Sequence, residues 1–141
     1  MYVLLLDGCS RERASDELAS DSLADDPLGA FNSSVAALRA ALRKPGALDL
    51  PCAHPLGDMV GLNLLRGRAG DVAVHSWDLA RAIGADEHLD PPLVDHALEV
   101  FVPNAERFLK LGTVAPAAGP TDESVPPQVR LLRLAGREPS G

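Results

Sequence analysis

The clearest helical pattern in the chain is the stretch DDPLGAFNSSVAALRAALRKPG, residues 25–46. It opens with two aspartates before Pro27, and an acidic N-cap followed by proline at the first helical position is typical of a helix start. The stretch ends at Pro45 and Gly46, just after basic residues that complement the helix dipole. Apolar residues recur at helical spacing, at Leu28, Phe31, Val35, Leu38 and Leu42. This seam predicts an amphipathic helix and, with the composition below, an all-α fold.

The composition agrees with helices packed on helices. Hydrophobic residues make up 46% of the 141 residues and aromatics only 4%, so the core must consist mainly of Leu, Ala and Val. The length fits a single domain over residues 1–141 that is large enough to bury a core. The twelve glycines and twelve prolines lack the period of collagen, which excludes a fibrous protein.

Charge and cysteine content limit the partners and the compartment. The net charge of -7 provides no electrostatic footprint for nucleic acid or for an anionic membrane surface, so neither is expected as a partner. Cys9 and Cys52 do not make a disulfide framework, and no secretory signal pattern is present. The apolar start over residues 1–6 is too short to span a bilayer. We therefore expect a cytoplasmic protein.

The first half of the chain predicts several shorter elements. Residues 1–6 stop at Asp7 and Gly8, which is typical of the last turn of a helix. Residues 9–26 are rich in Ser, Asp and Glu and predict a polar surface loop or a weak helical turn. Residues 47–60 contain two prolines and a Gly-Asp pair, which predict an extended loop or a small hairpin.

Three helices are predicted in the second half. The first covers residues 61–83, with an inner face formed by Leu62, Leu65, Ala69, Val72 and Leu79. The second begins after Asp90, and Pro103 within it predicts a kink or a short break; its inner face would hold Leu93, Ala97, Val100, Phe101, Phe108 and Leu111. A Pro/Ala/Gly connector over 113–127 precedes the third helix, 128–135, and a loose tail covers 137–141.

The residues with the clearest chemical potential lie in the stretch GDVAVHSWDLARA, residues 70–82. On a helix Asp71 and His75 share one face, and Asp78 follows on the same side. A carboxylate and an imidazole one turn apart can bind a divalent ion such as zinc, nickel or iron, provided that another element supplies further ligands. The alternative is an ordinary i,i+4 ion pair on a solvated face. Spacing alone leaves both open.

This stretch resembles the signature helix of the DinB-like metal-binding helical bundles. The likeness is to the branch of the mycothiol-dependent maleylpyruvate isomerase N-terminal, metal-binding domain, and it covers nearly the whole chain from about Leu5 onward. Beyond the helix, it extends to Asp25-Asp26-Pro27-Leu28, Arg43-x-Pro45-Gly46, His54-Pro55-Leu56-Gly57, Leu89-Asp90-Pro91, Pro126-Pro127-Gln128 and Gly136-Arg137-Glu138-Pro139. The resemblance implies a DinB-like bundle.

The resemblance also implies a metal site of three protein ligands. An acidic residue and a His four positions apart match Asp71 and His75, and the third ligand is a His on an early helix. Residues 1–8 resemble the stretch just after that helix, so the chain is expected to lack the first two helices of the bundle. A start at an internal methionine, a natural remnant and a short form that dimerises to rebuild the bundle would each account for this.

Other residues are candidates for the missing ligand or for support of the site. His54 is the best internal candidate for the third metal ligand, with an exposed loop histidine as the alternative. Further candidates are Cys9, Cys52, His88 and His96, for which structural or surface roles are the simpler interpretation. Asp78 would either orient His75 from outside the ligand set or pair with Arg81. Trp77 is favoured as a packing anchor.

The function implied by the resemblance is thiol chemistry at a divalent metal. The metal, zinc or nickel, would bind a low-molecular-weight thiol such as mycothiol and lower its pKa for a transfer or isomerisation reaction. The expected partners are a small-molecule thiol or substrate and a second copy of the chain. The alternative is a non-catalytic helical interaction module, or a degenerate remnant, that self-associates. The sequence contains no nucleophile elbow, phosphate loop, dinucleotide fingerprint or Cys-x-x-Cys pair.

Overall fold

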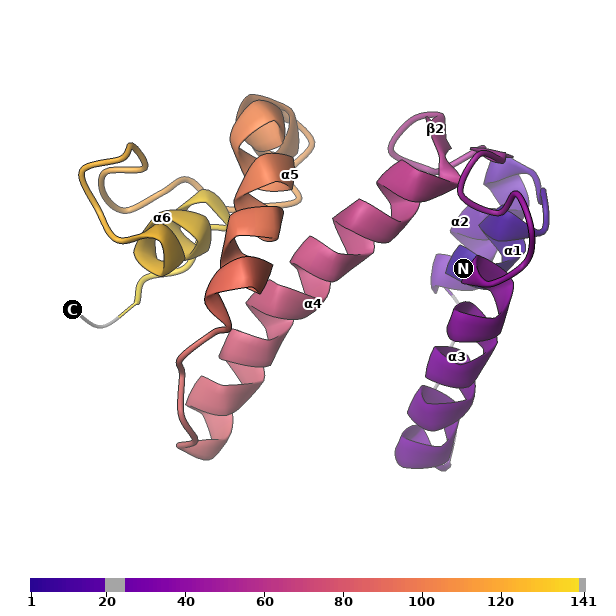
Figure 1. Cartoon of the computed structure of the whole chain (residues 1–141), viewed down its shortest axis with the longest axis horizontal. Coiled ribbons are helices and arrows are strands. Elements are labelled where there is room, and N and C mark those ends of the chain that lie inside the picture. The colour runs from indigo at the N-terminus through magenta and orange to yellow at the C-terminus, as the bar shows by residue number, and fades with distance from the viewer. Residues whose placement is uncertain (20–24, 140–141) are drawn as a thin grey trace. The chain divides into compact units, whose positions relative to one another are not determined.

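The computed structural model describes residues 1–19 and 25–139 and is mostly helical. The elements in the described residues are α1 Tyr2–Leu6, α2 Arg11–Ala19, α3 Pro27–Leu42, β1 Pro51–Cys52, β2 Met59–Val60, α4 Gly61–Ile83, α5 Pro91–Lys110 and α6 Pro127–Leu134 (Figure 1). This confirms the all-α prediction. The chain divides into two compact units, Met1–Leu65 and Arg66–Gly141, and each is described by itself. One domain over 1–141 stays a prediction.

The first unit is built around α1. This short helix packs against α2 and α3, and its end at Asp7 and Gly8 confirms the predicted last turn. The predicted hairpin also forms, since β1 and β2 pair antiparallel with Pro51 opposite Val60. The core of this unit takes buried residues from α1, α2, α3, β1 and the first residues of α4: Leu5, Leu6, Ala14, Ala41, Cys52 and Leu64.

Helix α3 follows the sequence prediction closely. A carboxylate oxygen of Asp26 accepts a hydrogen bond from the Gly29 amide at 2.9 Å, and Pro27 occupies the first turn. The predicted seam is buried only at its C-terminal end: Leu38 and Leu42 pack on the core, whereas Leu28 is 70% exposed and Phe31 is 55% exposed.

Helix α2 lies within residues 9–26, for which the sequence predicted a polar loop or a weak helical turn; the loop is wrong over Arg11–Ala19. Arg11–Ala19 is helical, and the fully buried Ala14 anchors it. The Arg11 guanidinium donates to the His54 carbonyl at 2.7 Å and to Asp58 at 2.6 Å, which ties the helix to the hairpin loop. The sequence of α2 shows no apolar seam, because the helix is strongly polar and its buried residue is only an alanine. The part of the predicted loop over 20–24 lies outside the described residues.

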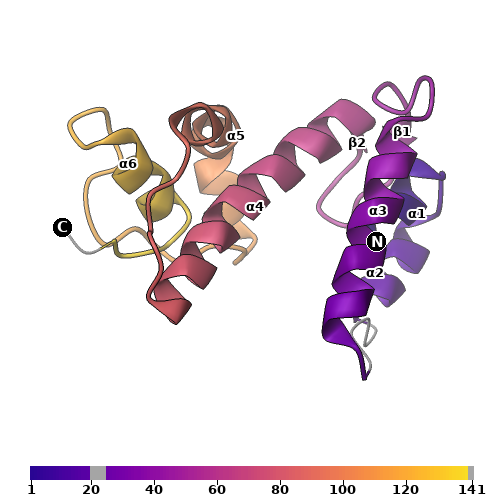
Figure 2. The same cartoon turned by 60° about the horizontal axis from the view of Figure 1, so that its bottom comes forward.

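The second unit joins most of α4 to α5 and α6. Helices α5 and α6 lie side by side (Figure 2). Gly70 of α4 faces Ala97 and Phe101 of α5, and a Cβ at Gly70 would lie 3.4 Å from the Phe101 ring. Helix α5 runs unbroken through Pro103, so no break occurs there. The buried core is Ala73, Val74, Trp77, Leu89, Val94, Ala97, Leu131, Leu132 and Ala135.

The predicted inner face of the helix over 61–83 is wrong. Leu62, Val72 and Leu79 are 39%, 43% and 62% exposed. The buried face instead carries Ala73, Val74 and Trp77. The exposed residues and the buried residues both recur at helical spacing. The prediction chose the face with the larger aliphatic side chains, and that face is the exposed one. Gly70 of α4 and Ala97 of α5 are small residues that lie against each other, a contact that apolar size alone does not reveal. In α5, similarly, the predicted inner residue Leu111 is 49% exposed.

The end of α6 corrects the predicted loose tail over 137–141 at its first residue, Arg137; residues 140–141 of that tail lie outside the described residues. Gly136 has φ +76°, its amide donates to the Arg133 carbonyl at 2.9 Å, and the Arg137 amide donates to the Leu132 carbonyl at 2.8 Å. These two bonds form a Schellman motif, in which glycine adopts the left-handed conformation. The motif fixes the backbone of Arg137, whose half-buried side chain reaches α4.

Gly136→Ala is expected to lower the free energy of unfolding by about 2–4 kcal/mol, since alanine is strained in the left-handed conformation and its Cβ would meet the Ala115 backbone. Gly84→Ala is the matched control. Gly84 ends α4 in the same motif with φ +66°, but no atom lies within 4 Å of its added Cβ, so about 1–2 kcal/mol is expected. Urea denaturation measures both, and equal losses would contradict a steric role for Ala115.

In the part of the chain that the structure describes, no helix combines the length and apolar character needed to cross a membrane.

Candidate functional site

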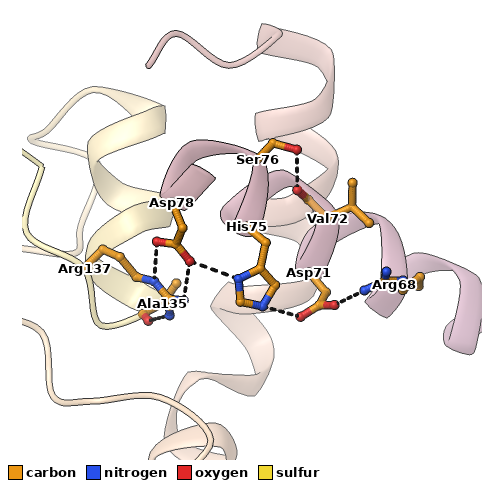
Figure 3. Close-up of polar contacts among 8 residues, drawn as sticks. All are labelled: Arg68, Asp71, Val72, His75, Ser76, Asp78, Ala135 and Arg137. Atoms are coloured by element: carbon orange, nitrogen blue, oxygen red, sulfur yellow. Dashed lines mark hydrogen bonds and ion pairs between the residues drawn. The ribbon is translucent and has the colours of Figure 1, made fainter. Parts of the chain in front are cut away.

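Three consecutive turns of α4 place Asp71, His75 and Asp78 together (Figure 3). The His75 ring lies between the two carboxylates. Its Nε2 is 3.3 Å from Asp71 Oδ1, and its Nδ1 is 3.0 Å from Asp78 Oδ2. The His75 side chain is 60% exposed and that of Asp71 is 42% exposed. The predicted spacing therefore produces a solvent-accessible row of carboxylate, imidazole and carboxylate.

Each carboxylate of the row also contacts an arginine. The other oxygen of Asp71 pairs with Arg68 one turn earlier on α4. Asp78 pairs with Arg137, which lies after α6: Nη2 is 2.7 Å from Asp78 Oδ2 and Nε is 3.2 Å from Oδ1. The Arg137 hydrogen bonds, aided by the contact with His75, hold the pKa of the Asp78 carboxyl below its usual range against the opposing effect of burial. Asp78 is therefore an anion at neutral pH.

Arg68 and Arg137 are the two residues of this cluster that the sequence analysis did not identify as part of the site. Arg137 lies in the stretch Gly136-Arg137-Glu138-Pro139. The one signal present was a glycine followed by arginine at the end of a predicted helix, which is consistent with a Schellman end. Nothing in that pattern names a partner 59 positions earlier.

The hydrogen-bond donors and acceptors of this row determine what can lie between His75 and Asp71. An ionised carboxylate only accepts hydrogen bonds, and a neutral imidazole has one N–H. If Nδ1 donates to Asp78, Nε2 turns a lone pair toward Asp71 Oδ1 at 3.3 Å. Two acceptors at that distance repel each other unless a proton or a cation lies between them. A cation bound between Nε2 and Asp71 Oδ1, such as a metal ion, would remove this repulsion.

The spacing of these two atoms fits a shared metal ion. Zinc binds histidine nitrogen and carboxylate oxygen at roughly 2.0–2.2 Å, so two ligands at the tetrahedral angle lie about 3.3–3.6 Å apart. The separation of His75 Nε2 and Asp71 Oδ1 is 3.3 Å. Among the described residues, no group of three or more His, Cys, Asp or Glu residues is arranged to hold a metal. Asp71 and His75 thus fit as two ligands, and a complete site needs more.

His54, the favoured third ligand, lies in the first unit, whereas Asp71 and His75 lie in the second. It is 8% exposed, which corrects the alternative of an exposed loop histidine. Its Nδ1 accepts a hydrogen bond from the Leu56 amide at 3.1 Å, and its ring lies 6.4 Å from that of Tyr2. Only Nε2 could therefore serve as a metal ligand. His54 as a ligand stays a prediction.

The remaining candidates have local surroundings that suit structural roles. Cys9 and Cys52 are both reduced thiols in the core of the first unit, and burial raises the pKa of Cys52, which disfavours the nucleophilic thiolate. His88 is exposed in the turn before α5, and its amide donates to Asp86. His96 is half-buried on α5, whereas a solvated surface group was expected from the sequence.

Trp77 is a packing residue, as favoured from the sequence. It is 4% exposed within the core of the second unit. The Arg81 guanidinium lies 5.0 Å from the centre of its ring, a cation–π contact on the outer edge of the core. Arg81 also pairs with Glu87 at 3.8 Å.

Comparisons with known proteins leave the family open. No model of a protein family matches the chain, and no solved structure matches it. The chain is similar to two uncharacterized proteins of Mycobacterium tuberculosis, one from strain CDC 1551 / Oshkosh and one from strain ATCC 25618 / H37Rv. Each is 28% identical over 111 residues, which is 78% of this chain and 61% of the relative. The chain thus spans less than two thirds of the relatives that it matches.

Proposed function

We propose that this protein binds a divalent metal ion, zinc or nickel, through Asp71 and His75. The observation that carries the proposal is the 3.3 Å separation of His75 Nε2 and Asp71 Oδ1 on the exposed face of α4, with the other ring nitrogen held by Asp78. Metal-binding histidines usually have such a partner on the second nitrogen. The third ligand comes from outside this row, either from His54 or from a second copy of the chain.

The proposal includes a relationship to the DinB-like, mycothiol-dependent maleylpyruvate isomerase branch. A divalent ion at this position would supply a Lewis acid that lowers the pKa of a small-molecule thiol. The chain's own contribution is to orient the His75 ring through Asp78 and to keep the pair accessible, since His75 is 60% exposed. We place the protein in the cytoplasm, where such a thiol and the two reduced cysteines would both be maintained.

A homo-oligomer is part of the proposal. Large apolar side chains are exposed in both units, among them Leu28 and Phe31 in the first and Leu79 and Ile83 in the second, at 55–70%. Burial of apolar surface contributes about 25 cal/mol per Å², so a second copy that covers them would be stabilised. Light scattering at micromolar concentration measures the mass, and a monomer would count against this part.

Metal analysis and zinc titration of the untagged protein test the site. We expect near-stoichiometric metal in the purified protein, and His75→Ala should weaken zinc binding by at least about 100-fold, because even the loss of an outer partner of a ligand costs 10–100-fold. His88→Ala is the control, since His88 is an exposed histidine outside the row. A wild-type protein that binds no zinc, or equal binding by the His75 variant, would contradict the site.

The same samples separate the metalloprotein from a non-catalytic helical interaction module. The observation that favours the module is that Arg68 already occupies one oxygen of Asp71, as in an ordinary surface ion-pair network. A module should keep its fold, its mass and its thermal midpoint after Asp71→Ala and His75→Ala, with or without zinc. A metalloprotein should show a thermal midpoint that rises with zinc only in the wild type.

A further inference from the structure

Arg137 is held more rigidly than its position near the end of the chain suggests. Its backbone is fixed by the Schellman motif at Gly136. Its guanidinium makes three hydrogen bonds, one from Nη1 to the Ala135 carbonyl at 2.6 Å and two to the carboxylate of Asp78. The side chain is only 27% exposed. A planar guanidinium with this many fixed contacts has little freedom to turn away from Asp78.

The position of Asp78 follows from this contact. The bidentate pairing fixes both carboxylate oxygens, and Oδ2 receives Nη2 of Arg137 at 2.7 Å together with Nδ1 of His75 at 3.0 Å. Both carboxylates beside the ring can only accept, so they compete for the single N–H of a neutral imidazole. The contact of Nδ1 with Asp78 is a hydrogen bond at 3.0 Å, whereas Nε2 and Asp71 Oδ1 lie 3.3 Å apart, so the proton belongs to Nδ1. In a neutral ring the tautomer is set by the hydrogen bond of one nitrogen, so Nε2 then carries the lone pair.

We propose that Arg137 is a positioning residue for the metal pair: through Asp78 it holds His75 in the Nδ1–H tautomer, with the Nε2 lone pair beside Asp71 Oδ1. This proposal rests on the proposed function, because the lone pair on Nε2 is useful only if His75 binds a metal ion. Arg137, in the segment after α6, thereby has a role in the site although it lies 59 positions from Asp78 in the sequence.

The competing explanation is that Arg137 only stabilises the unit by joining the end of α6 to α4. That role would make Arg137 variants less stable but would leave the His75 ring unchanged in the molecules that remain folded. The discriminating quantity is therefore the tautomer of His75, and it can be measured without metal.

Long-range ¹H–¹⁵N NMR of the metal-free protein gives the tautomer directly from the ¹⁵N shifts of the two ring nitrogens. The spectrum is taken at an alkaline pH at which these shifts show a singly protonated ring, and His75→Ala assigns the signal. We expect the Nδ1–H form in the wild type and a shift toward Nε2–H, the form favoured by solvated imidazole, in Arg137→Gln. Arg133→Gln is the control, since Arg133 lies on α6, four residues before Arg137, and donates to the Pro120 carbonyl instead.

Zinc titration of the same variants adds the functional consequence. Arg137→Gln should weaken zinc binding by about 10–100-fold, the range for loss of a partner that orients a ligand, and Arg133→Gln should leave it unchanged. Arg137→Lys keeps the charge but not the bidentate contact, and is expected to lie between the wild type and Arg137→Gln in both measurements. If Arg137→Gln does not fold, Arg137→Lys decides.

The outcomes separate the two proposals. An unchanged Nδ1–H form in folded Arg137→Gln would overturn the role of Arg137, even if zinc binds. A tautomer shift in a protein that binds no zinc would support the positioning role and overturn the metal site. An Nε2–H ring in the wild type would overturn the positioning role directly.

Discussion

Trp77→Ala is expected to lower the free energy of unfolding by about 3–5 kcal/mol, the largest loss of any single substitution that we predict. Trp77 is 4% exposed and lies among the buried residues contributed by α4, α5 and α6. Its removal leaves a cavity that small neighbours such as Ala73 and Ala97 cannot fill. Since small domains have a total stability of about 5–15 kcal/mol, the second unit would be close to unfolding.

Urea denaturation followed by circular dichroism is the appropriate measurement, because Trp77 is the sole tryptophan and its removal abolishes the fluorescence signal. Leu79→Ala is the control on the same helix. Leu79 is 62% exposed, so its truncation should change stability by no more than about 0.5 kcal/mol. A loss of less than about 1 kcal/mol for Trp77→Ala would contradict its place in the core.

Leu5→Ala is the corresponding prediction for the first unit, with an expected loss of about 2–5 kcal/mol. Leu5 is fully buried in α1, the short helix on which α2 and α3 pack. A five-residue helix is not stable by itself, so its position depends on this buried contact. Truncation should therefore loosen the helices that pack on it as well as α1 itself.

Amide hydrogen exchange over residues 1–65 measures this effect, because it reports opening within the unit that contains Leu5. Protection in α1 and α3 should fall by the factor that corresponds to the lost stability. Leu28→Ala serves as the control, since Leu28 is 70% exposed at the start of α3 and its loss should leave protection unchanged. Equal exchange in the wild type and Leu5→Ala would show that α1 does not support the unit.

Local sequence signals predicted the elements that depend on local interactions. The capping aspartate and first-turn proline of α3 and the turn residues of the hairpin act within a few residues, so their patterns were sufficient. Packing was harder to predict. Gly70 of α4 lies against Phe101 of α5, and apolar periodicity does not contain such a contact with another helix.

The same division applies to the site. The spacing of Asp71, His75 and Asp78 was enough to predict one row on one face, because helix geometry fixes it. Asp78 is held by Arg137, and the buried His54 is contacted by Arg11 at its carbonyl and by Tyr2 at its ring. These are long-range contacts in the sequence, and a single sequence gives no means of pairing them.

The Schellman end of α6 has a practical consequence for work on this protein. A chain cut after Ala135 would keep all of α4 and α6, yet it would lose the arginine that braces Asp78. A bulky fusion partner placed directly behind Pro139 would pull on the same residue. Activity or metal measurements on C-terminally trimmed or tagged protein would therefore report a perturbed site, and purification handles belong at the other terminus.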